Sequence, residues 1–150
     1  MNRRPITPNL AICDQPTEAD LEALKHEGYV GVVNLRNDGE PEQPLSTTAE
    51  GERVRALGMD YLHYGVGSAP LSEQGVGAVS EFLDRHAQDK VLVHCRKGGR
   101  AVALVLLHRA RAEGWSAAEA LAQGEQMGLK VEGGLRRLVE AYLAEHPGRA

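Results

Sequence analysis

The chain has 150 residues, of which 42% are hydrophobic and 25% are charged, and its net charge is −4. This length and composition predict one globular domain over residues 1–150 with a single buried core. The negative net charge argues against a nucleic-acid partner, and the lack of any apolar run of about 18 residues argues against a membrane span. Two cysteines are too few for a disulfide scaffold, so a reducing, cytoplasmic location is expected.

The first part of the chain alternates extended and helical patterns. Residues 6–13 are predicted to form an opening strand. The run QPTEADLEALKHEG predicts a helix, because Thr17 and Asp20 have the spacing of a capping box and a glycine closes the run. A β-rich segment follows at 29–36, and the polar segment 37–45 after it is expected to be a loop.

The rest of the chain continues this alternation and ends in helices. Ser46 and Ser72 are placed to open two helices on either side of a strand at 59–66. The segment 90–95 is almost wholly apolar, which is typical of a central parallel strand buried on both faces. Three helices are predicted after it, at 99–113, 116–127 and 133–145, and Ser116 with Glu119 has the spacing of a capping box at the start of the second. This order predicts an α/β fold in three layers, in which helices flank a mostly parallel central sheet of four to five strands.

A buried strand ends in a cysteine in the segment VLVHCRKGGRA, residues 91–101. Ligands of open α/β sheets bind beyond the carboxyl ends of the strands, and Cys95 lies at such an end. The helix that follows points the positive end of its dipole at this position, which favours thiolate over thiol. A cysteine in such a place can also serve as a small core hydrophobe, so the residues around it decide between the two interpretations.

The loop after the cysteine has the composition of an anion-binding site. It contains three cations and two glycines, which are Arg96, Lys97, Gly98, Gly99 and Arg100. This local positive charge in a chain that is negative overall favours an anionic ligand. The glycines allow backbone amides to face inward, and the guanidinium of Arg100 matches two oxygens of a tetrahedral oxyanion. The pattern predicts a thiolate nucleophile in an anion-binding loop.

The same segment resembles the signature loop of cysteine-dependent phosphatases, in which His-Cys opens a phosphate-binding loop and an arginine closes it. The preceding motifs, QPTEADLEALKHEGYVGVVNLRNDGE and then GMDYLHYGV, are similar to the phosphatase-like domain of the bacterial beta-lactamase hydrolase-like family. This family is a branch of the dual-specificity phosphatase fold, and the resemblance covers residues 6–113. It implies that Cys95 and Arg100 are catalytic, that the substrate is a phosphorylated molecule or another small anion, and that no cofactor or metal is used.

Two features depart from the phosphatase pattern. Only four residues separate Cys95 from Arg100, whereas the usual phosphatase loop has five, and Ala101 stands where that arginine would be. Four is the spacing of rhodanese-type sulfurtransferases, whose Cys-Arg-x-Gly-x-Arg loop resembles CRKGGR. The segment that matches the loop with the catalytic aspartate of these phosphatases reads GSAPLSEQ and contains no aspartate. The candidate acids are Asp38, Glu40 and Glu73.

Other side chains are assigned supporting roles. His94 precedes the nucleophile and is expected to hold the loop or to tune the thiol by hydrogen bonding. Arg36 ends a strand at the same edge, where it could form a second anion contact or pair with Asp38 or Glu40. Cys13 is either a resolving thiol or a core residue, and the core role is favoured. The remaining histidines have no metal-ligand spacing, so no metal site is predicted.

Three functions are compatible with these residues. The leading hypothesis is a cysteine-dependent phosphatase that acts on a phosphate monoester through a thiophosphoryl intermediate on Cys95. The second is a rhodanese-type sulfurtransferase that carries a persulfide on the same sulfur, which the short loop and the missing aspartate favour. The third is a non-catalytic module that binds an anion in the loop.

Overall fold

The computed structural model describes residues 1–146, which contain five strands and six helices. The strands are β1 (Arg4–Thr7), β2 (Leu10–Cys13), β3 (Tyr29–Asn34), β4 (Asp60–His63) and β5 (Lys90–His94). The helices are α1 (Glu18–His26), α2 (Thr47–Ala56), α3 (Glu73–Arg85), α4 (Gly99–Glu113), α5 (Ala117–Gln126) and α6 (Gly133–Glu145). None of these helices is long and apolar enough to cross a membrane.

The strands form one sheet in the order β1-β2-β5-β3-β4. β2, β5, β3 and β4 run parallel, and β1 pairs antiparallel with β2, which confirms the predicted mostly parallel sheet. The prediction of a single strand over residues 6–13 is wrong. Pro8 and Asn9 form a turn there, because proline has no N–H for a strand ladder, and the chain folds back as a hairpin.

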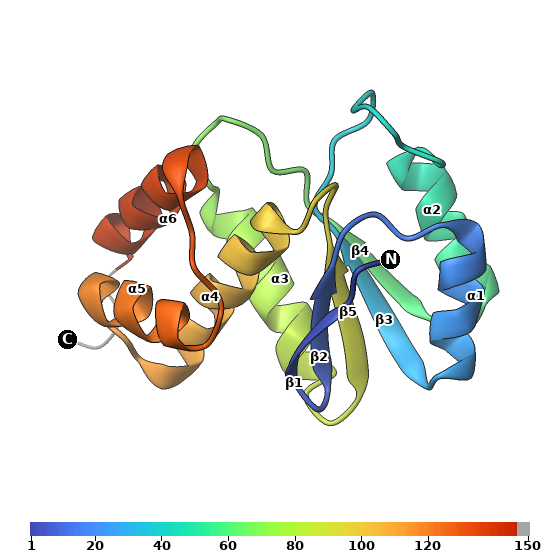
Figure 1. The fold of residues 1–150 in the computed structure, drawn as a ribbon, viewed down its shortest axis with the longest axis horizontal. Helices are drawn as coiled ribbons and strands as arrows, with labels where there is room; N and C mark the ends of the chain where they lie inside the picture. Colours follow the sequence, from blue (N-terminus) through green and yellow to red (C-terminus); the bar gives the residue numbers. More distant parts are fainter. Residues whose placement is uncertain (147–150) are drawn as a thin grey trace.

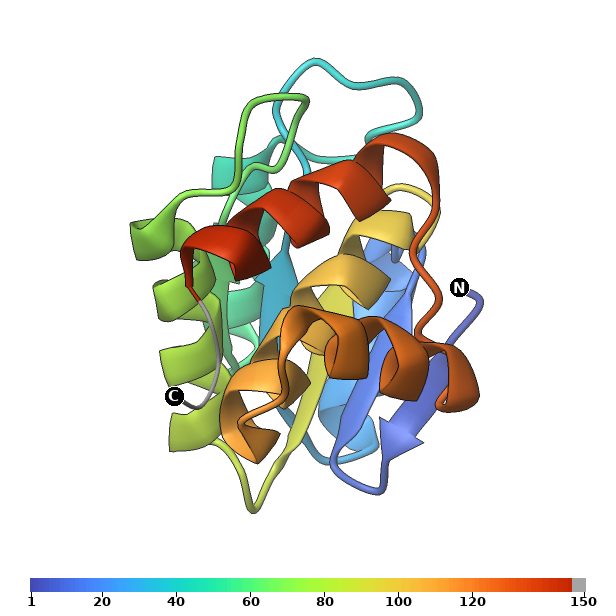
Figure 2. The ribbon, with the colours of Figure 1, turned by 90° about the vertical axis from the view of Figure 1, so that its left-hand side faces the viewer.

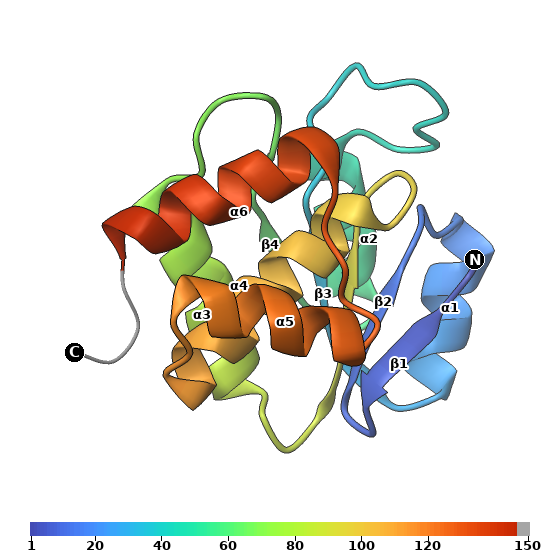
Figure 3. The same ribbon diagram turned by 60° about the vertical axis from the view of Figure 1, so that its left-hand side comes forward.

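Helices cover both faces of the sheet, so the predicted three layers are confirmed (Figure 1). α1 and α2 pack on one face, in a cluster that includes Val32, Tyr61 and Leu92. α3 and α4 pack on the other face, in a cluster that includes Val33 and Val93. α5 and α6 lie against the outer side of α4 (Figures 2 and 3).

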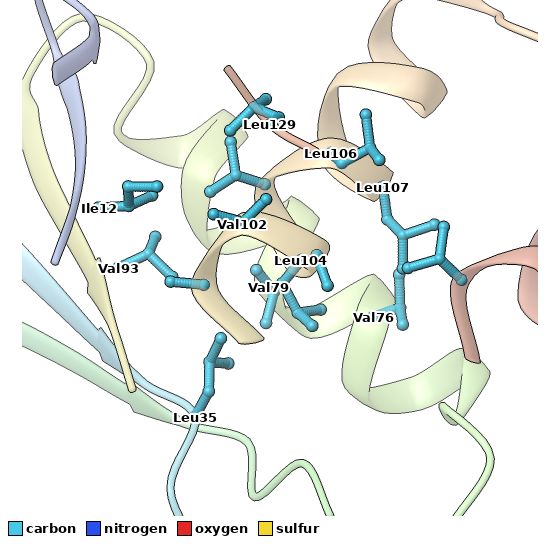
Figure 4. Packing of buried hydrophobic residues seen from close by; sticks show 14 of the residues in the cluster. Ile12, Leu35, Val76, Val79, Val93, Val102, Leu104, Leu106, Leu107 and Leu129 are labelled. Atoms are coloured by element: carbon cyan, nitrogen blue, oxygen red, sulfur yellow. The ribbon is translucent and has the colours of Figure 1, made fainter. Parts of the chain in front are cut away.

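The central strand β5 and the helix α4 form the middle of the core. Four of the five residues of β5 are buried, as expected for a central parallel strand. α4 buries eight of its 15 residues, because its side chains meet the sheet on one side and the C-terminal helices on the other (Figure 4). This packing fixes α4 relative to β5 and thereby fixes the short loop that joins them.

The helix starts follow the local signals in the sequence. Thr17 with Asp20, and Ser116 with Glu119, form the two predicted capping boxes. α4 differs, because it begins after Gly98, whose backbone is left-handed and which provides no side-chain cap. The first N–H groups of α4 are therefore directed at the β5–α4 loop without a side-chain acceptor from the capping position.

Candidate active site

The carboxyl ends of the parallel strands lie along one edge of the sheet, where the loops that follow them come together (Figure 1). β5 lies between β2 and β3, so His94 and Cys95 stand in the middle of this edge. The two residues are 0% and 1% exposed. The cysteine sulfur is thus at the buried base of the loop 95–100.

A backbone amide contacts the sulfur of Cys95. The N–H of Gly98 donates a hydrogen bond to Sγ, with an N···S distance of 3.0 Å. Gly98 has a φ of 107°, a conformation that a Cβ would strain, so glycine allows the turn that aims this amide at the sulfur. Gly99 and Ala101 belong to the first turn of α4, and Ala101 is buried in the core. Cys95 belongs to the same apolar cluster as Ala101, the one under α3 and α4. The residue therefore packs in the core and also has a polar contact at its sulfur.

Acceptors from two loops, those after β3 and β4, hold the guanidinium of Arg100. Nη1 donates to the carbonyl oxygens of Leu35 and Val66, at 3.4 and 3.0 Å. Both oxygens of the Glu40 carboxylate accept from Arg100, each at 2.8 Å, one from Nη1 and one from Nη2. The pKa of Arg100 is raised, mainly by its hydrogen bonds with Glu40. Burial lowers this pKa, and the nearby sulfur of Cys95 raises it further. The guanidinium is therefore oriented by Glu40 and lies within electrostatic reach of the cysteine.

Glu40, one of the candidate acids, is an ion-pair partner of two arginines. Besides Arg100, Arg36 donates from Nε to Oε1 of Glu40 at 3.1 Å. The pKa of Glu40 is lowered to about 2, mainly by its hydrogen bonds from Arg100. Partial burial acts in the opposite direction, and hydrogen bonds from the backbone N–H of Asn37 and from the side chain of Arg36 lower the pKa further. Glu40 is ionised near neutral pH in this arrangement and holds no proton to donate.

Arg36 is fully buried and holds the loop after β3. Its Nη1 donates to Oε1 of Gln15 at 2.8 Å and to the carbonyl of Glu42 at 3.1 Å. Its Nη2 donates to the carbonyl of Pro41 at 2.5 Å. Of the two roles considered for Arg36, the structure contains the pairing with Glu40.

Arg96 and Lys97 lie at the rim of the loop. Arg96 donates to the carboxylate of Glu42 and thereby lowers the pKa of that carboxyl, while Lys97 is exposed. Both cations line a surface hollow together with residues of the loops after β2 and β3. Arg100 lines a second hollow, with Val66 and the first turns of α6. Lys97, Gly98 and Gly99 line a third hollow, so the buried sulfur lies at the base of a loop that is flanked by surface hollows.

A buried contact between His94 and Glu50, which the sequence pattern did not predict, supports this loop. His94 Nε2 and Glu50 Oε2 are 2.7 Å apart, and both side chains are almost fully buried. His94 Nδ1 lies 3.3 Å from the carbonyl oxygen of Cys95. Burial raises the pKa of Glu50, but the hydrogen bonds from His94 and Gln15 outweigh it, so the pKa is lowered. The ring of His94 is therefore held between the carboxylate of Glu50 and the backbone carbonyl of Cys95.

The other two candidate acids are engaged elsewhere. Asp38 accepts from the backbone N–H of Thr47 at 2.7 Å and from its hydroxyl at 3.2 Å, and so it caps α2. Glu73 begins α3, has a side chain that is 82% exposed, and lies 3.8 Å from His146 Nε2. Among the contacts of residues 1–146, neither carboxylate bonds to Arg100, so the structure brings only Glu40 to that side chain.

Cys13, the second thiol, lies on the other face of the sheet. Its side chain belongs to the apolar cluster under α1 and α2, whereas Cys95 belongs to the cluster under α3 and α4. Burial raises the pKa of the Cys13 thiol, so it stays protonated near neutral pH. The geometry is that of a core residue. In the described part of the chain, no three His, Cys, Asp or Glu side chains are grouped as metal ligands.

The geometry defines the class of the domain. A central parallel strand leads into a buried cysteine, a glycine-rich cationic loop follows and contacts the sulfur through the Gly98 amide, and a helix with an arginine in its first turn comes next. The fold that carries these residues is that of the cysteine-type phosphatases. Residues 2–112 match the family model of the beta-lactamase hydrolase-like protein, phosphatase-like domain. The chain belongs to this family, which confirms the resemblance found in its sequence.

Curated relatives in this family are longer proteins. The beta-lactamase hydrolase-like protein of Agrobacterium fabrum is 35% identical over 106 residues, which are 70% of this chain and 24% of that protein. Its counterpart from Xylella fastidiosa is 34% identical over 103 residues, 68% of this chain and 23% of that protein. The chain therefore spans about a quarter of the length of these relatives.

Solved structures share the fold over almost the whole chain. Tk-PTP has a TM-score of 0.76 at 23% identity, and the match covers 95% of this chain and 96% of that one. TpbA of P. aeruginosa has a TM-score of 0.67 at 19% identity, with 95% and 83% covered. The common fold thus extends past residue 112, where the family match ends, and includes helices of the C-terminal cluster.

Proposed function

We propose that this domain is a cysteine-dependent phosphatase that hydrolyses a phosphate monoester through a thiophosphoryl intermediate on Cys95. The observation that carries the proposal is the contact between the Gly98 amide and the cysteine sulfur at 3.0 Å, with the guanidinium of Arg100 beside it. An amide donor, a nearby cation and the start of a helix can all bind an anion at this sulfur. The thiolate is the form of cysteine that acts as a nucleophile.

Arg100 has the geometry of an oxyanion clamp. Glu40 occupies the edge formed by Nη1 and Nη2. Nε makes no hydrogen bond to an oxygen of residues 1–146, and Nη2 carries a second N–H besides the one that it gives to Glu40. The planar guanidinium can therefore bind two phosphoryl oxygens at once along the edge formed by Nε and Nη2. Glu40 would then act as a positioning residue, which orients Arg100 without touching the substrate.

The proposed reaction has two steps. The Cys95 thiolate attacks phosphorus, an S–P bond forms, the P–O bond to the leaving group breaks, and the leaving oxygen takes a proton from solvent. Water then attacks phosphorus, the S–P bond breaks, and orthophosphate leaves with the thiolate restored. Arg100 and the first amides of α4 stabilise the charge on the equatorial oxygens in both steps.

The placement of the carboxylates favours substrates with good leaving groups. Glu40 is ionised, Asp38 caps a helix and Glu73 lies on another hollow, so none of them is placed to protonate a leaving alkoxide. A missing general acid costs about 10²–10⁴-fold in rate for a basic leaving group, and much less for a phenolate. Aryl phosphates are therefore the proposed substrate class. TpbA has been solved in complex with pTyr, which supports this choice.

Sulfur transfer is a second candidate, because four residues separate Cys95 from Arg100. In that reaction the thiolate takes the outer sulfur of thiosulfate, sulfite leaves, and a persulfide forms on Cys95. Cyanide then attacks the outer sulfur, and thiocyanate leaves with the thiolate restored. The smaller loop suits such a small anion.

One pair of assays distinguishes these reactions. Aryl phosphate hydrolysis and thiosulfate-to-cyanide transfer are measured side by side for the wild type, Cys95→Ser and Arg100→Ala, with Cys13→Ala as the matched thiol control. We expect phosphate release that both site variants lose and the control retains. Thiocyanate without phosphate release would favour sulfur transfer. If neither product forms, the proposal fails and a module that only binds an anion remains.

A further inference from the structure

A hollow of about 580 Å³ lies between α3, α4 and α6, at the end of α4 that is farther from Cys95. Its α3 wall includes Val76, Gly77 and Ser80, and its other walls include Trp115 and Tyr142. A volume of this size is within the range of small-molecule sites, which is about 300–1,000 Å³. We refer to it below as the α3–α6 hollow. Figure 3 shows α6 crossing above α3 and α4 in this part of the molecule.

Ser80 supplies an unused hydrogen-bonding group to this hollow. The residue is 1% exposed, and its Oγ has no hydrogen-bond partner among residues 1–146. Buried hydroxyl groups are normally paired, because an unpaired one has lost its bonds to water and gained none in return. A bound molecule that reaches Oγ with a donor or an acceptor would satisfy it.

The remaining lining indicates the chemistry of that molecule. Val76 and Leu107 contribute aliphatic surface, and Trp115 and Tyr142 contribute aromatic rings that suit a flat apolar partner. Charged groups at the rim are already paired. Glu73 lies 3.8 Å from His146 Nε2, and Arg111 Nη1 lies 3.0 Å from Asp84 Oδ2. Because these side chains already have partners, none of them requires an ionic ligand.

We infer that the α3–α6 hollow is a binding site for a small neutral aromatic molecule that carries one hydrogen-bonding group, which meets Ser80 Oγ. The site is separate from Cys95 and does not depend on the proposed phosphatase activity. Aromatic stacking area supplies the affinity, and the buried hydroxyl selects ligands that can pair with it.

Gly77 provides a way to close the hollow without touching its hydrogen-bonding group. A Cβ at this position would meet no atom within 4 Å, and the residue lies in the interior of a regular helix. Gly77→Leu would extend a side chain into open space and fill the hollow, whereas Gly77→Ala adds a single carbon and serves as the matched control. Ser80→Ala removes only the unpaired hydroxyl.

The test uses 4-fluorophenol and fluorobenzene as probes, because they differ only in the hydroxyl group and both are neutral near pH 7. Fluorine NMR line widths measure binding. The fluorescence of Trp115, the only tryptophan of the chain, reports whether binding occurs at this hollow. For a probe of this size we expect a dissociation constant on the order of 1 mM for 4-fluorophenol. Urea denaturation checks that each variant is folded.

The proposal predicts a different response to each substitution. Ser80→Ala should lower the affinity for 4-fluorophenol by roughly 2- to 10-fold, which is the effect of one neutral hydrogen bond. The affinity for fluorobenzene should not change. Gly77→Leu should abolish binding of both probes and Gly77→Ala should retain it. The proposal is overturned if neither probe binds the wild type, if Trp115 does not respond, or if Ser80→Ala weakens both probes equally. Should Gly77→Leu fail to fold, the Ser80→Ala comparison still decides.

Discussion

Replacing Glu50 with glutamine removes the charge of a carboxylate that is 1% exposed and lies 2.7 Å from Nε2 of His94. The same carboxylate also accepts a hydrogen bond from Nε2 of Gln15, at 3.0 Å. A glutamine amide has one oxygen and one NH₂ group, so at this position it turns an NH₂ toward one of two donors. The substitution therefore leaves one buried donor unpaired and removes the negative charge that lies beside the ring of His94.

The size of the effect follows from these two losses. An unpaired buried donor costs about 1–3 kcal/mol. Breaking a buried ion pair costs roughly 3–5 kcal/mol when the remaining charge stays in place. The glutamine amide keeps one oxygen and one NH₂ group for these neighbours, so we place the cost below that upper range. We expect Glu50→Gln to lower the free energy of unfolding by about 2–3 kcal/mol, which a domain with a stability of roughly 5–15 kcal/mol survives in the folded state.

The pH dependence tests the cause of the loss. Because the pKa of Glu50 is lower in the folded chain than in the unfolded one, its stabilising contribution is complete above the unfolded pKa of about 4.3. The contribution is lost as the pH falls through the folded pKa. The difference in unfolding free energy between wild type and Glu50→Gln should thus be largest near pH 7 and should shrink as the pH falls below about 4.

Urea denaturation at several pH values measures this difference. Glu52→Gln is the matched control, because Glu52 lies on the exposed side of the same helix and should change stability by less than about 0.5 kcal/mol. The reasoning is refuted if Glu50→Gln costs no more than Glu52→Gln at pH 7. It is also refuted if the cost grows as the solution becomes more acidic.

Three further substitutions test other parts of the site. In Glu40→Gln the guanidinium of Arg100 loses the carboxylate that orients it, so kcat/KM for an aryl phosphate should fall by roughly 10- to 100-fold, and an unchanged value would contradict this role. Gly98→Ala places a Cβ on a backbone with φ of 107°, which should lower the unfolding free energy in urea by about 1–3 kcal/mol; a neutral result would mean that the loop relaxes. Cys13→Ala should retain turnover and leave one thiol for alkylation, and a loss as large as that of Cys95→Ser would mean that Cys13 takes part in the chemistry.

Local signals made most of the fold predictable. The apolar run at 90–95 identified the central strand, and Ser116 with Glu119 identified the start of α5. These signals act within a few residues, so they can be read without knowledge of the rest of the chain. The hairpin of β1 and β2 was missed although Pro8 marks its turn, because each strand has only four residues and the pattern resembles one longer strand.

The contacts of the site are harder to predict, because they join distant residues. Thr47, Glu50, Gly51 and Val54 are the buried residues of α2, and their helical spacing is a signal that places Glu50 on the inner face. A carboxylate on that face requires a buried partner, but nothing local identifies His94, which is 44 residues away. Glu40 illustrates the same limit, since its partner Arg100 is 60 residues away and makes the carboxylate an ion pair.

These pairings determine what kind of field the sulfur experiences. Arg96 and Arg100 each contact a carboxylate, so much of the positive charge that the sequence concentrates around Cys95 is neutralised nearby. The binding of an anion at this position must then depend on groups near the sulfur, namely the Gly98 amide, the start of α4 and the guanidinium of Arg100. Each carboxylate holds its cation in a fixed direction while cancelling its long-range charge. The loop between β3 and α2 is therefore part of the site through Glu40 and Glu42, although its carboxylates make no contact with the sulfur in the described structure.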